Sequence, residues 1–127
     1  MSSENPAPTI LVVEDDSFLR DLLVEKLQEE HYNVVGAADG NEAYEQLAKQ
    51  LPHVIVLDLI LPDLNGFDIL EKITSDERTK TVPVIVLSNL DQKEDIDKAM
   101  SLGAVDFMIK ANFSLTEILA RIKKQLA

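Results

Sequence analysis

The chain has 127 residues and 46% apolar residues, which excludes a disordered chain and fits one domain with a full core. It has no cysteine, so disulfides and thiolate metal sites are excluded, and its net charge of −11 argues against direct nucleic-acid binding. No apolar stretch is long enough for a membrane span and no signal-peptide pattern opens the chain, so we expect a cytoplasmic protein without a membrane partner.

Residues 1–8 are polar with two prolines, and we expect a flexible tail there, followed by a single domain at residues 9–127. Apolar runs then alternate with amphipathic stretches. Strands are predicted at Thr9–Val13, Asn33–Ala38, His53–Asp58, Val82–Ser88 and Val105–Ile109. Helices are predicted at Ser17–Glu30, Asn41–Leu51, Phe67–Thr74, Glu94–Leu102 and Leu115–Leu126. In the first helix Phe18, Leu19, Leu22, Leu23 and Leu27 are expected to face inward, and in the second Ala43, Tyr44, Leu47, Ala48 and Leu51.

Five strands alternating with five helices predict an α/β fold, in which a doubly wound parallel sheet is covered by helices on both faces. The first, third and fourth strands are continuous apolar runs, which is typical of central strands. Pro83 is acceptable at the start of the fourth strand, where its missing N–H breaks no ladder.

Polar side chains gather where these strands end. In such sheets function collects outside the carboxyl ends of the strands, and those ends carry Glu14, Asp15, Asp58, Ser88 and Lys110. The carboxylates would repel one another without a divalent cation, and their hard oxygens suit Mg²⁺ or Mn²⁺. An ammonium and a hydroxyl beside them suit a phosphoryl group, and a carboxylate can itself be the nucleophile that forms an aspartyl-phosphate. Asp58, at the end of a buried strand, is the best candidate.

Taken singly, these residues also fit structural roles. Asp16 or Ser17 fits a cap for the first helix, Glu14 and Asp15 fit a solvated loop, and Asp58 fits the start of a turn. The combination favours a site, because four separate strand ends would otherwise carry the right groups by accident.

Four segments together resemble the receiver domain of bacterial two-component response regulators. They are Ile10–Asp16, Val56–Pro62 with Asn65-Gly66, Pro83–Ser88 and Gly103–Lys110. The resemblance covers roughly Thr9 to Leu126, and it implies a flavodoxin-like sheet in strand order 2-1-3-4-5.

The resemblance also implies a role for each site residue. Asp58 would be the phosphoacceptor, taking its phosphoryl group from a phosphohistidine on a sensor histidine kinase or phosphotransfer protein. The protein would then be no enzyme, beyond promoting its own phosphorylation and dephosphorylation. The other implied roles are metal ligation by Asp15, Asp58, the Ile60 backbone carbonyl and, through water, Glu14; phosphoryl binding by Ser88 and Lys110; and switching by Ser88 and Phe107. Phe107 also fits an ordinary core or surface aromatic.

The chain departs from the family pattern around the lysine and the nucleophile. Ala111 stands where proline usually follows the lysine, so we expect a trans bond and a different aim for Lys110, since a cis bond there costs about 3 kcal/mol. Asn89 stands where a small residue is common, and its amide would partly screen the site. Ile60 and Leu90 are apolar beside the path of an attacking water, which predicts a long-lived phosphoryl group.

A receiver without an output domain would act by docking, and the resemblance implies a downstream protein that binds the fourth helix, fifth strand and fifth helix. Asp106, Glu117 and Arg121 resemble residues that pair across dimers of winged-helix regulators, which predicts a weak homodimer favoured by phosphorylation. Ile96 stands where those regulators usually have a basic residue, and ordinary solvated surface charge remains the alternative.

Three other functions stay open. A Mg²⁺-dependent aspartyl-nucleophile phosphatase would place its nucleophile in an Asp-x-Asp motif on the first strand, which Glu14-Asp15-Asp16 does not match. A flavodoxin-like FMN binder would need a Ser/Thr/Gly-rich loop after that strand, where the acidic triplet would repel phosphate. A receiver-like adaptor that no longer accepts phosphate is compatible with Asn89 and Ala111.

Overall fold

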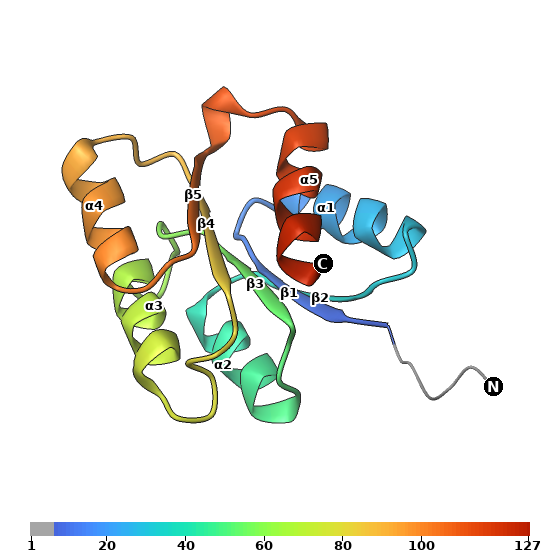
Figure 1. Ribbon diagram of the computed structural model, residues 1–127, viewed down its shortest axis with the longest axis horizontal. Coiled ribbons are helices and arrows are strands. Elements are labelled where there is room, and N and C mark those ends of the chain that lie inside the picture. Colours follow the sequence, from blue (N-terminus) through green and yellow to red (C-terminus); the bar gives the residue numbers. More distant parts are fainter. Residues whose placement is uncertain (1–6) are drawn as a thin grey trace.

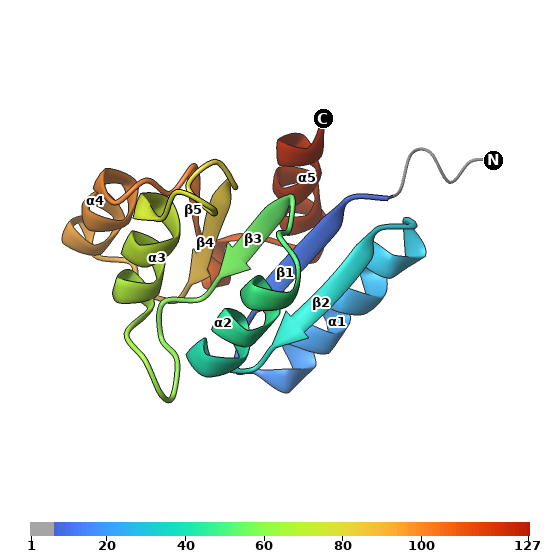
Figure 2. The same cartoon turned by 90° about the horizontal axis from the view of Figure 1, so that it is seen from below.

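The computed structural model describes residues 7–127, whose strands form one parallel sheet in the order β2-β1-β3-β4-β5. This is the predicted order, and Figure 2 shows the strands side by side in it. The strands are β1 Thr9–Val13, β2 Asn33–Ala37, β3 Val54–Leu57, β4 Val84–Ser88 and β5 Asp106–Ile109.

Helices cover both faces of the sheet, with α1 and α5 on one face and α2, α3 and α4 on the other (Figure 1). The helices are α1 Ser17–Glu29, α2 Gly40–Lys49, α3 Gly66–Ser75, α4 Lys93–Ser101 and α5 Leu115–Leu126. None of the helices between residues 7 and 127 has the length and apolarity needed to cross a bilayer.

Alternation along β1 divides the core into two layers. Ile10 and Val12 pack with the buried side chains of α1 and α5, while Leu11 and Val13 pack with those of α2, α3 and α4. Successive side chains of a strand point to opposite faces, so a strand covered on both faces must be apolar throughout. This explains why the continuous apolar runs of β1, β3 and β4 occupy the centre of the sheet.

The expected tail at residues 1–8 lies mostly outside the described residues. Within them, the carbonyls of Ala7 and Pro8 accept hydrogen bonds from the side-chain amide and the backbone N–H of Asn33. These bonds continue the β1–β2 pairing beyond the first residue of β1.

Side-chain N-caps are present at most of the helices. Asp16 accepts hydrogen bonds from the N–H groups of Phe18 and Leu19, so the predicted capping of α1 is confirmed. Ser114 and Glu117 form a capping box at α5. In contrast, Gln92, the residue before α4, forms no side-chain cap.

The carboxyl end of α4 is held more firmly than its beginning. Thr74 of α3 donates its hydroxyl to the Leu102 carbonyl at 2.6 Å. Gly103 follows with φ +104°, and the Thr74 side chain packs directly against it. A side chain at Gly103 would be strained in this backbone region, which explains a glycine at the end of α4.

Three inward-facing assignments are wrong. Phe18 is 77% exposed, because it lies about 140° around the helix from the buried Leu23 at 3.6 residues per turn. Leu51 is 40% exposed and lies beyond the end of α2, where the helical period no longer orients it. Ala48, in the last turn of α2, is also exposed.

Candidate functional site

Backbone pairing brings the acidic residues together at the carboxyl edge of the sheet. The Glu14 N–H donates to the Ala37 carbonyl at 2.9 Å, and the Asp58 N–H donates to the Val13 carbonyl at 3.0 Å. Glu14 therefore lies one residue beyond β1 and next to the end of β2, and Asp58 lies one residue beyond β3 and next to the end of β1. Carboxylate oxygens of Glu14, Asp15 and Asp58 lie within 4.8 Å of one another. Three hard oxygen donors at this spacing fit a Mg²⁺ or Mn²⁺ ion.

The side chain of Lys110 lies between two of these carboxylates. Its ammonium is 2.7 Å from Glu14 Oε1 and 2.8 Å from Asp58 Oδ2. No cis peptide bond occurs in the described residues, so the expected trans bond at Lys110–Ala111 is confirmed. The trans bond leaves the lysine in full contact with Asp58, so the Ala111 departure does not direct it away from the site.

Burial makes Glu14 an unusual carboxylate. It is 2% exposed, and desolvation raises its pKa from 4.5 to about 7. Hydrogen bonds from Lys110 and from the Asp16 N–H oppose this rise, and the negative charge of Asp58 adds to it. Burial lowers the pKa of Lys110, but the hydrogen bonds that its ammonium donates to Asp58 and Glu14 outweigh this effect and leave that pKa above its ordinary value. The neutral form of Glu14 is therefore accessible near neutral pH, while Lys110 stays charged.

Ser88 and Phe107 lie on the adjoining strands β4 and β5. Ser88 ends β4 and is fully buried, and its Oγ accepts a hydrogen bond from the Leu90 N–H at 3.4 Å. Phe107 is half-buried and packs against the core layer of α2, α3 and α4. Asn89 is exposed and lines a cavity of about 230 Å³ together with Ile60, Lys110 and three aspartates, Asp15, Asp16 and Asp58. Leu90 packs against the core instead of lining this cavity.

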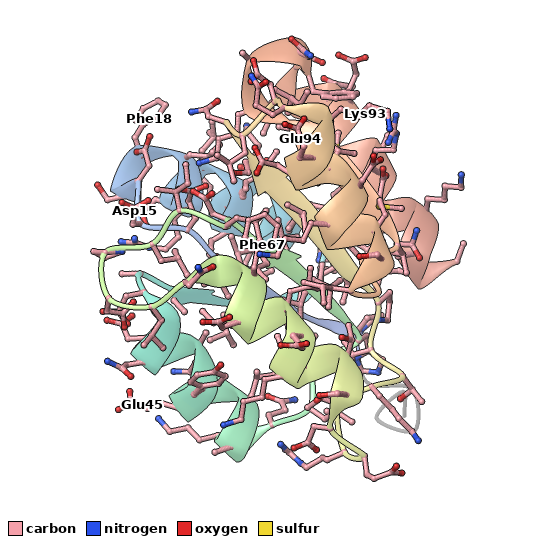
Figure 3. The ribbon with its side chains drawn as sticks, turned by 90° about the vertical axis from the view of Figure 1, so that its left-hand side faces the viewer. Asp15, Phe18, Glu45, Phe67, Lys93 and Glu94 are labelled. Atoms are coloured by element: carbon pink, nitrogen blue, oxygen red, sulfur yellow. The ribbon has the colours of Figure 1, made fainter. Side chains whose placement is uncertain are left out.

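The segment after Asp58 is an ordered loop. The Ile60 N–H donates to Asp58 Oδ1 at 3.1 Å, and Ile60 forms an isolated bridge with Asn65. The Ile60 side chain is 54% exposed at the cavity rim. Close by, Figure 3 shows Phe18 projecting from the start of α1 near Asp15.

The predicted dimer residues make contacts within their own chain. Arg121 donates to Asp106 Oδ2 at 2.7 Å, linking α5 to β5, and its guanidinium lies 5.1 Å from the centre of the Phe113 ring. Glu117 takes part in the capping box of α5.

Sequence reasoning missed two residues that support the site. Arg20 donates to the Glu14 carbonyl at 2.9 Å and lies across Gly36, where a Cβ would come within 3.2 Å of its Cδ. Asp63 binds two N–H groups of α2. Both contacts join separate segments, so no local pattern reveals them, although a small residue at position 36 is a weak signal for a side chain lying over the strand.

Comparison with known proteins gives consistent matches. The family model described as the response regulator receiver domain matches residues 10–123. The DNA-binding dual master transcriptional regulator RpaA of Synechocystis sp. is 38% identical over 120 residues, which cover 94% of this chain and 49% of that protein. The chain thus spans about half the length of RpaA and of several other curated relatives it matches.

Solved structures agree with this assignment. The non-phosphorylated HemR receiver domain from Leptospira biflexa superposes with a TM-score of 0.86 at 36% identity, covering 94% of each chain. The BeF3-activated DrrB receiver domain has a TM-score of 0.84 at 32% identity, covering 94% of this chain and 97% of that one. With the predicted strand order and the carboxylate–lysine site in place, the chain belongs to the receiver-domain family of two-component response regulators.

Proposed function

We propose that this chain is a phosphorylation-activated signalling switch whose phosphoacceptor is Asp58. The observation that carries the proposal is the contact between the Asp58 carboxylate and the Lys110 ammonium inside a group of three carboxylates. Together these carboxylates and Lys110 supply a nucleophile, hard metal ligands and a fixed positive charge at one site. The donor would be a phosphohistidine on a sensor histidine kinase or phosphotransfer protein, and the exchange would take place in the cytoplasm.

In the proposed reaction a carboxylate oxygen of Asp58 attacks phosphorus, while the bond from phosphorus to the histidine nitrogen breaks and its electron pair returns to the imidazole. Glu14, Asp15, Asp58 and the Ile60 carbonyl would hold Mg²⁺. When bound, Mg²⁺ neutralises charge on the phosphoryl oxygens. Lys110 already contacts Asp58 and needs only to follow the new oxygens. In this proposal the chain would promote only its own phosphorylation and dephosphorylation, so we class it as a switch and not as an enzyme.

A phosphoryl group adds about two negative charges, and switching would follow from this added charge. The Ser88 hydroxyl, which now accepts from the Leu90 N–H, would instead donate to a phosphoryl oxygen. Phe107, half-buried on the next strand, would move into the space that Ser88 leaves. The result is a population shift at α4, β5 and α5, where we place the binding surface for a downstream protein.

A weak phosphorylation-favoured homodimer through the same surface remains part of the proposal. Asp106 and Arg121 would have to exchange their in-chain contact for one across the dimer. Light scattering with Mg²⁺ and BeF3⁻, a phosphoryl mimic, tests this, and an unchanged monomer mass would count against it.

The test of the phosphoacceptor is intact-mass measurement after incubation with Mg²⁺ and acetyl phosphate. We expect one phosphate adduct on the wild type and none on Asp58→Ala. Asp16→Asn is the matched control, because it removes a neighbouring charge while asparagine still caps α1. That variant should keep the adduct. A wild type without any adduct would instead support the adaptor function.

A further inference from the structure

Asp63 joins two segments that flank the site from different sides. It lies in the loop Leu59–Asn65, which connects β3 to α3. Its two carboxylate oxygens accept hydrogen bonds from the N–H groups of Gly40 and Asn41, each at 2.9 Å. These donors are the first two residues of α2 and precede Asp63 by 23 and 22 positions.

This contact is not the ordinary cap of α2. Asp39 already caps the helix by accepting from the Glu42 N–H at 2.8 Å, and Glu42 accepts from the Ala38 N–H at 2.9 Å. Asp63 therefore serves donors that the helix's own cap leaves open. The approach is close, since a Cβ at Gly40 would lie 2.7 Å from Leu64 Cδ1. Glycine at position 40 lets the loop rest on the start of α2.

Hydrogen bonds within the loop connect the segment around Asp63 to the site. Ile60 and Asn65 form a bridge, and the Gly66 N–H donates to the Leu59 carbonyl at 3.1 Å. The Ile60 N–H in turn holds Asp58 Oδ1. Movement of Asp63 would therefore be shared with Ile60 and Asp58.

The segment that Asp63 binds also supports the other half of the site. Ala37, at the end of β2, accepts the Glu14 N–H at 2.9 Å. Residues 37–41 thus contact the acidic end of β1 directly and the loop after β3 through Asp63. The relative position of Glu14 and Ile60 depends on one short stretch of chain.

We propose that Asp63 is a positioning residue that holds the Leu59–Asn65 loop, and with it Asp58 and the Ile60 carbonyl, in the arrangement a divalent cation requires. This inference rests on the proposed function. Asp63 is exposed and is not one of the three carboxylates whose oxygens cluster at the site. Because Mg²⁺ demands near-ideal octahedral geometry, a small shift of the loop lowers affinity.

The titration of Asp63 agrees with this contact. Desolvation raises the pKa of its carboxyl, but hydrogen bonds from the N–H groups of Gly40 and Asn41, together with those of residues 63 and 64, outweigh it and leave the pKa below its ordinary value. The tether is therefore charged throughout the neutral range.

The test measures Mn²⁺ binding by electron paramagnetic resonance, with Mn²⁺ as the probe, in four proteins. Asp63→Ala should bind Mn²⁺ about tenfold more weakly than wild type, the scale on which supporting residues affect metal sites. Asp63→Asn keeps one acceptor oxygen, so its Mn²⁺ affinity should lie between those of wild type and Asp63→Ala. Asp39→Ala is the matched control, because it weakens the same helix end without touching the loop, and it should bind close to wild type.

Amide hydrogen exchange of the metal-free proteins gives a second readout. In Asp63→Ala the amides of Gly40 and Asn41, and those of residues 60–66, should exchange faster than in wild type. Equal Mn²⁺ affinity in Asp63→Ala and wild type overturns the inference, as does an equal loss in Asp39→Ala. If Asp63→Ala does not fold, Asp63→Asn decides by the same criteria. A wild type that binds no Mn²⁺ and forms no phosphate adduct would instead overturn the proposed function itself.

Discussion

The Lys110 ammonium lies 2.8 Å from Asp58 Oδ2, although the two residues are 52 positions apart and their strands are not neighbours. β4 separates β3 from β5, so only a long side chain can span the distance. The same ammonium reaches Glu14 at 2.7 Å beyond the end of β1. One lysine therefore compensates carboxylates from two central strands.

Replacing Lys110 with methionine should destabilise the metal-free protein by about 1–3 kcal/mol, because two buried carboxylates lose their partner. Urea unfolding at pH 8, where Glu14 is ionised, measures the effect. Adding Mg²⁺ should recover much of the loss. Lys93→Met removes an ion pair that is exposed on both sides and should change stability little. Equal losses in the two variants would contradict a special role for Lys110.

Proton binding by Glu14 should compete with metal binding. Because its pKa is raised to about 7, the apparent Mg²⁺ affinity should fall by up to about tenfold for each pH unit below 7 and level off above it. Calorimetric titration from pH 5.5 to 8.5 measures this profile. Glu14→Gln has no proton to lose and should bind weakly with a flatter dependence. A wild-type profile as flat as that of the variant would contradict competition between the Glu14 proton and the metal.

The same shift determines how Glu14 affects folding without metal. Its folded pKa lies above the ordinary 4.5, so between about pH 4.5 and 7 the folded state binds the extra proton. The contribution of Glu14 to the free energy of unfolding should therefore decrease as pH rises through this window. The difference between wild type and Glu14→Gln in urea unfolding isolates it from other groups. A difference that grows in favour of wild type with rising pH would have the wrong sign.

Gly66 should tolerate no side chain. A Cβ there would lie 2.3 Å from the Leu59 Cα and 2.5 Å from its carbonyl oxygen, and backbone cannot move aside as a flexible side chain can. Gly66→Ala should lower stability by about 1–3 kcal/mol in thermal or urea unfolding. Gly36→Ala is the control, because the nearest atoms to its Cβ belong to the side chains of Arg20, at 3.2 Å, and Val24, at 3.6 Å, and not to the backbone. That variant should stay within about 0.5 kcal/mol of wild type.

Ile60 should prolong the life of the phosphoryl group. Its exposed side chain lines the cavity and offers no hydrogen bond to an attacking water. Ile60→Asn should shorten the half-life several-fold by orienting water, whereas Ile60→Val should not. Intact mass followed over time after removal of the donor gives the rates. Loss from the wild type within seconds would refute the prediction.

The central part of the fold could be predicted from the sequence because burial on both faces makes β1, β3 and β4 apolar throughout. Glu14, Asp58 and Ser88 stand at the carboxyl ends of these strands, so most of the proposed site could be predicted from the sequence as well. The prediction for Phe18 is wrong because Phe18 is apolar but lies about 140° around α1 from the buried Leu23. No local pattern around Asp63 predicts its contacts, because its partners Gly40 and Asn41 are distant in sequence. Contacts of this kind depend on how segments meet, which local pattern does not encode.

Because its two ends are held differently, we expect α4 to pivot about its carboxyl end. The hydroxyl of Thr74 binds the Leu102 carbonyl directly after the helix, while the first turn has no side-chain cap and begins shortly after the segment that carries Ser88, Asn89 and Leu90. A displacement of Ser88 should therefore swing the beginning of α4 about a stationary end, so that its first turn sweeps the largest arc. Amide exchange should accordingly be faster over residues 93–96 than over residues 98–102.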